Sequence, residues 1–447
     1  MKKQAKVFSI RAARKSSHIA TKVFTKGLKF TTKVEDKATK ILTGVDFSVA
    51  ALQEVSFEKV FYNGIPYNIA PLNPALPALG REGAVTLLIP SLTKSSFYGG
   101  TATALIVAGK LAIKLKKPLR IIETLQPGGK DGLTTFFSDN GIDIKEEDVN
   151  LIDVSSRRYN VYGYVDIHKD DVYIASAWWD AHLLAQLPLP TKFIYLIQDF
   201  EPIFYANSDK YVLAETTYRS DSFIPICNTQ LMYDFMAERY PYIKKNGIWF
   251  EPAVGQSASG MSVKKSEGEK KRIFLYGRPN VERNLFYSAL SALDKLFMSQ
   301  TLSGNEWEVY MAGQDKVPNI TLTSDVVVKN LGKLTMDEYK EFAKSVDLTI
   351  SLMMAPHPNY PTLEMSSIGS AVVTTKYANK QDLSNYSKNI FMADLTIESI
   401  AETIVEASRP TYDERIKNAE KSNINTDWEK ALAPSITDLS KKISIKK

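Results

Sequence analysis

The stretch that decides the fold is Ala355-Pro-His-Pro-Asn-Tyr-Pro-Thr-Leu-Glu-Met-Ser-Ser-Ile-Gly-Ser-Ala-Val-Val373. A proline-rich loop leads to a helix that we expect to open near Thr362, then to a turn at Gly369 and a buried strand over residues 371–373. The free N–H groups and positive dipole end of such a helix attract anions. A plain structural helix with a capping Glu364 is the alternative, and the stretch alone does not decide between them.

The chemistry of this helix start favours one class of ligand. Glu364 stands in the first turn of the expected helix, where its carboxylate would accept hydrogen bonds from a sugar diol. The amides of Thr362 and Leu363 would face phosphate oxygens. The arrangement suits a nucleoside diphosphate, with the phosphates on the amides and ribose or deoxyribose on the carboxylate.

A second element places cations beside the same expected sheet. The run over residues 272–284 is a short apolar strand that ends in Gly277 and is followed by Arg278 and Arg283. Ligands of open α/β sheets bind just past the carboxyl ends of the strands. The arginine guanidinium is planar and always charged, so it can bind pyrophosphate oxygens well. We therefore favour phosphate binding by these arginines over a solvated surface role.

The first half of the chain repeats the strand-then-helix pattern. A strand over residues 84–90 precedes Gly99 and Gly100, and a helical pattern follows over residues 102–116. This order is typical of the start of a Rossmann-like half, although a glycine pair can also be a simple tight turn. Strands and helices alternate from there on, which indicates parallel α/β layers. The further expected strands cover residues 119–123, 150–154, 171–175, 193–197, 222–226, 272–276, 306–312, 326–331, 347–352, 371–374 and 389–392.

Two carboxylates follow one of these strands, in Gln198-Asp-Phe-Glu201. On an extended backbone Asp199 and Glu201 would share a face, so an acid–base pair of a glycosidase has to be considered. The nucleotide-type second half argues against hydrolysis. We therefore interpret Asp199 as an acceptor-orienting or catalytic carboxylate, with Gln198 and Glu201 as hydrogen-bond partners of acceptor or sugar.

Two histidines are further candidates. His182 follows the strand at residues 171–175 on a Trp-Trp-Asp-Ala-His segment, and His357 stands in the loop before Glu364. A purely structural role is equally open for each of them. Aromatic residues near these motifs are candidates for stacking on a sugar, although such residues more often belong to a core; they are Trp178, Trp179, Phe204 and Tyr205.

Taken together, these motifs resemble family 4 glycosyltransferases of the GT-B fold. Members of that family carry a strand followed by G-R-x-x-x-x-K, and a later loop that ends in E-x7-E. Arg278 and Arg283 match the first motif, with Arg in place of Lys, and Glu364 matches the second Glu. Position 356 is Pro, so the first Glu is missing. That departure argues against an ordinary glucosyl or mannosyl donor.

The first half narrows the resemblance. Residues 171–182 and 193–205 are similar to WsaF-type rhamnosyltransferases of bacterial surface glycans, and the likeness runs from about residue 85 to 410. It implies two Rossmann-like domains that face a cleft, and retaining transfer of L-rhamnose from dTDP-β-L-rhamnose to a polysaccharide or lipid-linked glycan. It also implies that Gly99 and Gly100 approach the donor phosphate and that Lys333 lies in a base- and phosphate-contacting loop; a solvated loop lysine is the alternative. Another donor, such as a UDP- or GDP-sugar, and a non-catalytic glycan-binding protein of this fold remain open.

The expected domains follow from composition and from this resemblance. A basic arm covers residues 1–45, an acceptor-side Rossmann-like domain covers 46–255, a nucleotide-sugar-binding Rossmann-like domain covers 256–424, and a helix that crosses back covers 425–447. The polar run over residues 255–271 is interpreted as the linker or an exposed loop beside it. We expect residues 408–447 to be helical and polar, with Trp428 as an anchor.

Charge and composition bound the partners. Residues 1–45 hold twelve Lys or Arg and two acids, so that segment carries +10 while the whole chain carries +6. Apolar residues among those cations favour an anionic membrane surface over a solubilising tail, and nucleic acid is the least favoured partner because no recognition motif stands beside them. The chain has a single cysteine, Cys227, and lacks a signal peptide and a membrane span, which predicts a cytoplasmic protein. Peripheral binding to the inner face of the cell membrane stays open.

No metal or cofactor is expected beyond the nucleotide-sugar donor. The chain contains no Asp-x-Asp and no Cys/His cluster. Arginines and amide dipoles would then stabilise the leaving diphosphate in place of a metal ion. The sequence therefore predicts metal-independent transfer.

Overall fold

The computed structural model describes residues 57–65, 69–76, 78, 80–157, 164–254 and 260–444. The chain divides into an N-terminal unit of residues 1–70 and a larger unit of residues 71–447. In the N-terminal unit, helix α2 (Phe57–Gly64) is described. The predicted basic arm of residues 1–45 lies outside the described residues.

The first half of the larger unit is built on a seven-stranded parallel sheet in the order β4-β3-β2-β6-β7-β8-β9. Counted along the chain, the order runs outward from β2 in both directions, as in doubly wound sheets, and it reverses between β2 and β6. The strands are β2 (Val85–Ile89), β3 (Leu119–Glu123), β4 (Asn150–Asp153), β6 (Val172–Ala175), β7 (Phe193–Ile197), β8 (Phe223–Asn228) and β9 (Ile248–Phe250). A separate two-stranded sheet joins β1 (Asn73–Ala75) to β5 (Tyr164–Asp166).

The second half repeats this plan. Its sheet has the order β12-β13-β11-β10-β14-β15-β16, parallel except for the edge pair β12–β13, and it reverses between β10 and β14. The strands are β10 (Lys271–Tyr276), β11 (Trp307–Ala312), β12 (Ile320–Thr321), β13 (Val327–Asn330), β14 (Leu348–Ile350), β15 (Ala371–Thr375) and β16 (Ile390–Ala393). The GT-B expectation of two such sheets is confirmed.

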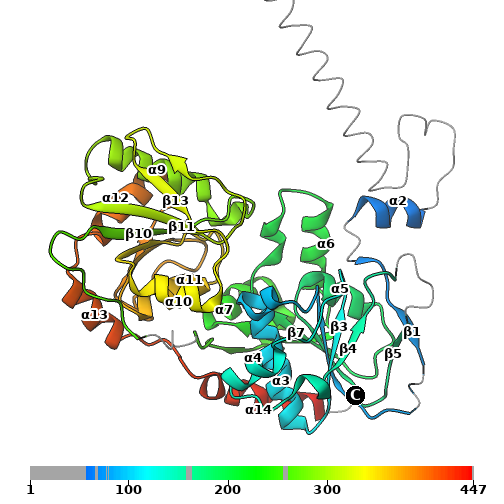
Figure 1. Cartoon of the computed structure of the whole chain (residues 1–447). Coiled ribbons are helices and arrows are strands. Elements are labelled where there is room, and N and C mark those ends of the chain that lie inside the picture. The colour runs from blue at the N-terminus through cyan, green and yellow to red at the C-terminus, as the bar shows by residue number, and fades with distance from the viewer. Residues whose placement is uncertain are drawn as a thin grey trace, which may run out of the picture. The chain divides into compact units, whose positions relative to one another are not determined.

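Helices cover the faces of both sheets (Figure 1). In the first half they are α3 (Gly99–Leu115), α4 (Leu133–Asp139), α5 (Trp178–Ala185), α6 (Asp209–Thr217), α7 (Gln230–Arg239) and α8 (Pro241–Asn246). In the second half they are α9 (Phe286–Met298), α10 (Met336–Lys344), α11 (Tyr360–Ser367), α12 (Ile397–Ala407) and α13 (Tyr412–Glu420). The last described helix is α14 (Trp428–Ser444). Short 3-10 helices are η3 (Lys94–Phe97), η4 (Glu146–Asp148), η5 (Glu201–Phe204) and η6 (Glu282–Asn284).

The strand sequences explain this layered arrangement. Every residue of β2 and of β7 is buried, so helices must cover both faces of the sheet. Strands of that kind read as continuous apolar runs rather than as alternating ones, which is why the sequence predicted parallel sheets. The second core likewise joins β10, β14 and β15 to α9 and α12.

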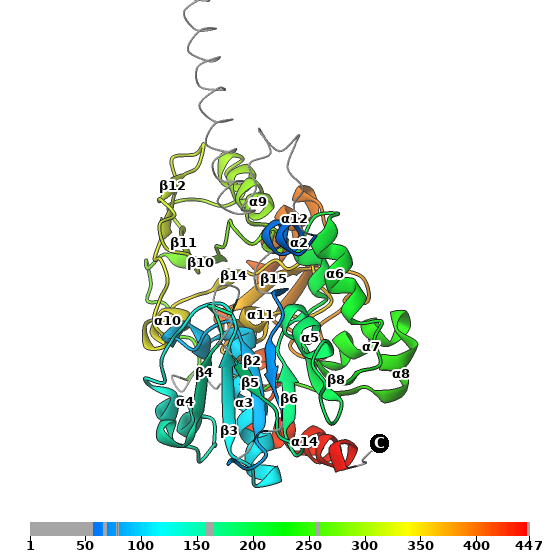
Figure 2. The ribbon, with the colours of Figure 1, turned by 90° about the vertical axis from the view of Figure 1, so that its right-hand side faces the viewer.

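The last helix returns to the first half. Residues Trp428, Leu432, Ile436 and Leu439 of α14 belong to the same apolar core as β2 and α3. Figure 2 shows α14 beside elements of the first half, although the whole second half precedes it in the chain. The region expected to be continuously helical over 408–447 is instead two helices, because residues 421–427 form a break between α13 and α14. Among the described helices, none combines the length and the apolar character that crossing a bilayer requires.

A cavity between the two sheets as the candidate active site

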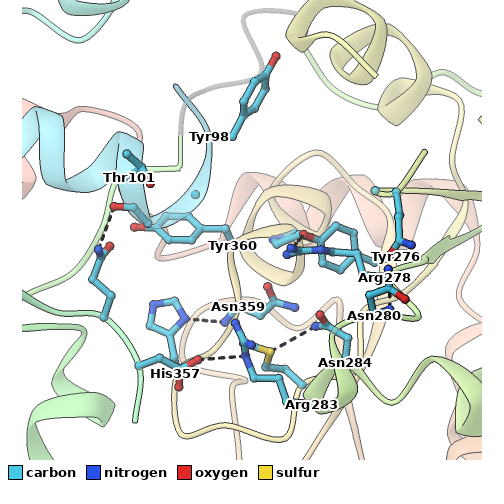
Figure 3. Close-up of a pocket in the computed structure, with 18 of the residues that line it drawn as sticks. Tyr98, Thr101, Tyr276, Arg278, Asn280, Arg283, Asn284, His357, Asn359 and Tyr360 are labelled. Atoms are coloured by element: carbon cyan, nitrogen blue, oxygen red, sulfur yellow. Dashed lines mark hydrogen bonds and ion pairs between the residues drawn. The ribbon is translucent and has the colours of Figure 1, made fainter. Parts of the chain in front are cut away.

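The carboxyl ends of the two sheets face a common cavity of about 930 Å³. Its wall is formed by the residues that follow β2, β6 and β7 in the first half and β10, β11 and β14 in the second (Figure 3). Both switch points of the strand order therefore open into the same space, which is where doubly wound sheets bind ligands. The predicted site residues that line it are Gly99, Gly100, Gln198, Asp199, Glu201, Arg278, Arg283, Lys333 and Glu364.

Three predicted site residues do not line this cavity. His182 lies half-buried on α5, where burial lowers its pKa, and its carbonyl accepts from the side chain of Gln186. Thr362 and Leu363 are buried within α11. The structure therefore places the side chains of Thr362 and Leu363 in the protein interior, and all three side chains lie outside the lining of the cavity.

The helix at the centre of the prediction begins two residues earlier than expected. Because α11 starts at Tyr360, Glu364 stands at the beginning of the second turn and not in the first. Pro361 has no N–H to offer, and the Leu363 N–H donates to the Asn359 carbonyl at 3.3 Å. The anion site at this helix start is therefore smaller than the sequence suggested, and the cations carry more of the attraction.

Two cations of the second half face the cavity without an acidic partner. Arg278 follows β10, and its Nη1 donates to the Tyr276 hydroxyl at 3.3 Å. Lys333 is exposed, with its backbone N–H bound to the Asp315 carboxylate at 2.9 Å. Within the part of the chain that the structure describes, neither side chain forms an ion pair. Figure 3 shows Arg278 reaching into the cavity beside Tyr276. This leaves two positive groups available to an anionic ligand.

Arg283 has a different environment. Its Nε lies 3.4 Å from an Asp199 carboxylate oxygen, and its guanidinium lies over the Phe204 ring at 3.9 Å. Burial lowers the pKa of Arg283, and the charge of Arg278 adds to that effect. Arg283 thus joins the second half to the first, since Asp199 and Phe204 both follow β7.

The two carboxylates after β7 do not share a face as an extended pair. Glu201 begins the 3-10 helix η5, and its carboxylate accepts from the Trp178 N–H. Asp199 accepts from the Phe200 N–H at 2.8 Å in addition to its contact with Arg283. Burial raises the pKa of both acids, and for Glu201 the nearby charges of Asp180 and Asp199 raise it further. The expected extended geometry was wrong, because the chain turns immediately after Asp199.

The two glycines suit the start of α3 for different reasons, a close neighbour at Gly100 and a left-handed backbone at Gly99. Gln198 Nε2 donates to the Gly100 carbonyl at 2.8 Å, and a Cβ on Gly100 would lie 3.2 Å from that same nitrogen. Gly99 has φ +57°, a backbone conformation that favours glycine. These two residues open α3 and let the backbone itself form the wall of the cavity.

Glu364 is partly buried at the opposite side. Its carboxylate accepts from the Tyr339 hydroxyl at 3.2 Å, and burial raises its pKa. The second carboxylate oxygen makes no contact with another described side chain. Glu364 can therefore accept a further hydrogen bond from a ligand in the cavity.

Sequence reasoning missed two residues near this site, the half-buried Tyr360 and the buried Lys380. Tyr360 joins α11 to the first half through its hydroxyl, which lies 2.7 Å from Thr103 Oγ1 and 2.9 Å from Asn228 Nδ2. Lys380 is fully buried, and its Nζ donates to the Met353 carbonyl at 2.9 Å. Burial lowers its pKa to about 7. Neither residue directly follows a strand, so the expectation that ligands bind just past strand ends did not single out either of them.

Comparison with known proteins decides the family. The family model for the WsaF N-terminal domain matches residues 84–230, and the model for the WsaF C-terminal domain matches residues 271–405. The chain belongs to the WsaF family. The two WsaF domains coincide with the two sheets that form the cavity. The resemblance to WsaF-type enzymes that the sequence motifs indicated is thereby confirmed. The family match also supports a glycosyltransferase rather than a glycosidase.

One curated relative of this WsaF protein is similar over part of its length. The O-antigen biosynthesis protein RfbC of Myxococcus xanthus is 31% identical over 261 residues, which are 58% of this chain. The matched part is only 20% of the relative, so the chain spans about a fifth of that protein's length. The family match itself supports a glycosyltransferase.

Solved structures agree on the fold. WaaG, a glycosyltransferase involved in lipopolysaccharide biosynthesis, aligns with TM-score 0.55 and 13% identity over 79% of this chain and 99% of its own. Anabaena HepE in complex with UDP aligns with TM-score 0.52 and 12% identity over 80% of this chain and 100% of its own. A variant of S. aureus TarM in complex with UDP and glycans gives TM-score 0.56 and 10% identity over 81% and 100%. At these identities the likeness establishes the GT-B fold of the WsaF protein.

Proposed function

We propose that this protein transfers L-rhamnose from dTDP-β-L-rhamnose to a growing cell-surface polysaccharide or lipid-linked glycan, with retention of configuration and without a metal ion. The proposal rests on two cations, Arg278 and Lys333, which line the cavity between the two sheets and form no ion pair among the described residues. Two positive groups suit a diphosphate leaving group better than a neutral ligand. The WsaF resemblance supports the choice of dTDP-rhamnose.

The residues of the wall have distinct roles in this proposal. Arg278 and Lys333 bind the diphosphate, and Glu364 accepts a hydrogen bond from the deoxyribose hydroxyl. Arg283 stays charged beside Asp199 and adds positive potential where negative charge develops on the leaving oxygen. The backbone at Gly99 and Gly100 comes close to the phosphates from the other side.

The reaction itself needs no nucleophile of the protein. The bond between the anomeric carbon and the phosphate oxygen breaks, and a bond to the acceptor oxygen forms on the same face. The acceptor proton passes to the departing phosphate oxygen, and dTDP leaves. Asp199 lines the cavity beside Gln198 and orients the acceptor there. The charge of Arg283 opposes the rise that burial causes in the pKa of Asp199.

A second candidate donor is a UDP-sugar, because UDP is the nucleotide named in the structures of HepE and TarM. The two candidates share the fold and the cations and differ in the base and the sugar. A glycan-binding protein without turnover would use the same cavity. All three are separated by one transfer assay.

The test supplies radiolabelled dTDP-β-L-rhamnose, UDP-glucose or UDP-N-acetylglucosamine to the purified full chain, with a lipid-linked glycan fraction as acceptor and EDTA throughout. We expect label to enter the glycan from dTDP-rhamnose alone, with a β-linkage seen by NMR. Label from a UDP-sugar alone would replace the donor assignment. Transfer that appears only after Mn²⁺ or Mg²⁺ is added would contradict metal independence, and nucleotide binding without any transfer would favour the glycan-binding alternative.

The basic arm and the membrane surface stay predictions, because residues 1–45 lie outside the described residues. A lipid-linked acceptor would give such an arm a purpose. Sedimentation of the full chain with vesicles that contain anionic lipid tests this. No sedimentation at physiological salt would remove the membrane from the list of partners.

A further inference from the structure

One buried nitrogen of the cavity wall has no partner. The His357 side chain lines the cavity and is only 4% exposed. Its Nδ1 accepts the Asn359 backbone N–H at 2.9 Å, which fixes the proton of the neutral ring on Nε2. Among the described residues, nothing accepts a hydrogen bond from that Nε2. A buried donor left without a partner is costly, so its presence in a cavity wall points to a ligand.

The loop that carries His357 is held from several sides. The Asn359 side chain donates to Ser351 Oγ at 2.8 Å. Lys380 Nζ donates to the Met353 carbonyl at 2.9 Å and lies 3.4 Å from the His357 carbonyl. These contacts fix the backbone on both sides of the ring. Figure 3 shows the His357 ring joined to Asn359 on the same side of the cavity as Arg283 and Asn284.

His357 is neutral in this setting. Burial lowers its pKa to about 3, and the neighbouring charges of Lys380 and Arg283 act in the same direction. A neutral imidazole adds no net charge to a site that already has Arg278, Arg283 and Lys333 for the diphosphate. It offers a single directed N–H, which is suited to an uncharged oxygen rather than to phosphate.

We propose that His357 is a specificity-determining residue that donates a hydrogen bond from Nε2 to an oxygen of the transferred sugar. This inference rests on the proposed function and assigns the sugar part of the donor to the loop over residues 355–359. The diphosphate lies on the cations, and the sugar lies against His357. A site built to hydrogen-bond one substrate oxygen discriminates strongly against a ligand that lacks it.

Two substitutions separate the donor role from the structural one. In His357→Asn, the short side chain keeps an oxygen near the Nδ1 position, where it can still accept the Asn359 N–H, but nothing reaches the Nε2 position. In His357→Gln, the longer side chain carries an N–H group to about the Nε2 position. If His357 only supported the loop, His357→Asn would weaken the binding of dTDP and of dTDP-β-L-rhamnose alike. His357→Gln would then not restore the binding of the sugar nucleotide.

The experiment measures the affinity of the full chain for dTDP and for dTDP-β-L-rhamnose by calorimetry, for wild type and for both variants. We expect wild type to bind the sugar nucleotide about five- to twentyfold more tightly than dTDP, as one directed hydrogen bond with its surrounding contacts provides. His357→Asn should lose most of that gain while its affinity for dTDP stays within about twofold. His357→Gln should retain the larger part of the gain.

The outcomes distinguish the two levels of the proposal. If wild type does not bind dTDP at all, the proposed function fails. If wild type gains affinity from the sugar and His357→Asn keeps the whole gain, the role of His357 is wrong while the proposed function stands. If His357→Asn weakens dTDP and dTDP-rhamnose equally, His357 only supports the loop, and the inference is overturned. A wild type that gains nothing from the sugar overturns it as well.

Discussion

The Tyr360 hydroxyl lies 2.7 Å from the Thr103 hydroxyl, and this contact joins the two halves of the larger unit across the cavity. Tyr360 is the first residue of α11, which carries Glu364, and Thr103 lies in the helix that opens with Gly99 and Gly100. The loop of the second half and the glycine pair of the first are thereby held in one arrangement. Asn228 Nδ2 donates to the same hydroxyl at 2.9 Å, so the contact has a second support.

Tyr360→Phe should weaken this junction. The change removes one hydroxyl and leaves Thr103 and Asn228, both buried, without that partner. We expect a loss of about 1–3 kcal/mol in unfolding free energy, and a lower transfer rate. Chemical denaturation and the transfer assay measure the two effects. The exposed Tyr287→Phe is the matched control, and equal stability of both variants would contradict the role of this contact.

Arg278→Ala should weaken nucleotide binding. The side chain faces the cavity and has no acidic partner among the described residues, so it is free to bind a diphosphate. A lost charged hydrogen bond is worth about 1.5–3 kcal/mol, which is roughly a 10- to 150-fold weaker Kd for dTDP. Calorimetry measures this. Arg219→Ala is the control, because Arg219 follows α6 at the surface, where it pairs with Glu215. An unchanged Kd for Arg278→Ala would show that the diphosphate binds elsewhere.

Glu364→Gln should abolish recognition of the sugar hydroxyl of the nucleoside. Wild type is expected to bind dTDP about tenfold more tightly than its 3′-deoxy analogue, because the analogue lacks the hydroxyl that the carboxylate would accept from. The variant should bind the two ligands almost equally. A double-mutant cycle over both ligands isolates the contact. If the variant discriminates as well as wild type does, Glu364 does not contact that hydroxyl.

Asp180 should make stability fall as pH rises. It is fully buried behind the cavity, its Oδ2 accepts from Ser176 Oγ at 2.9 Å, and burial raises its pKa from 3.8 to about 7. An acid whose folded-state pKa is raised holds its proton more tightly in the folded chain. Its contribution to stability is therefore present below about pH 4 and is lost as pH rises through about 7, at a total of roughly 4 kcal/mol.

Asp180→Asn tests this directly. Asn resembles the protonated acid, so we expect the variant to match wild type near pH 4 and to exceed it near pH 8. Urea unfolding at several pH values measures the slope. The exposed Asp131→Asn is the control and should follow wild type throughout. A variant with the same slope as wild type would show that Asp180 is ionised in the folded chain at all these pH values.

Much of the fold was predictable because local patterns specify it. Buried parallel strands such as β3 and β7 need continuous apolar runs, and these are visible in the sequence. Short edge elements such as β12 were missed because two residues carry no periodicity. The break between α13 and α14 was missed because the polar residues around it resemble an exposed helical face.

The site was predictable where residues directly follow strands. Arg278, Asp199 and Glu364 line the cavity because strand ends and the helix after β14 converge there. Contacts across the cavity, such as Tyr360 with Thr103, depend on how the two halves meet, and no local pattern encodes that. His182 lies outside the cavity lining because it stands on α5, and the sequence does not show which face of that helix points toward the cavity.

The most direct test of the central claim is calorimetric titration of the full chain with dTDP, UDP, GDP and ADP, with EDTA present throughout. We predict that dTDP binds with a clear preference over the other three and that EDTA does not abolish binding. Preference for UDP or GDP would contradict the rhamnose assignment. Binding of none of the four would contradict the nucleotide site itself.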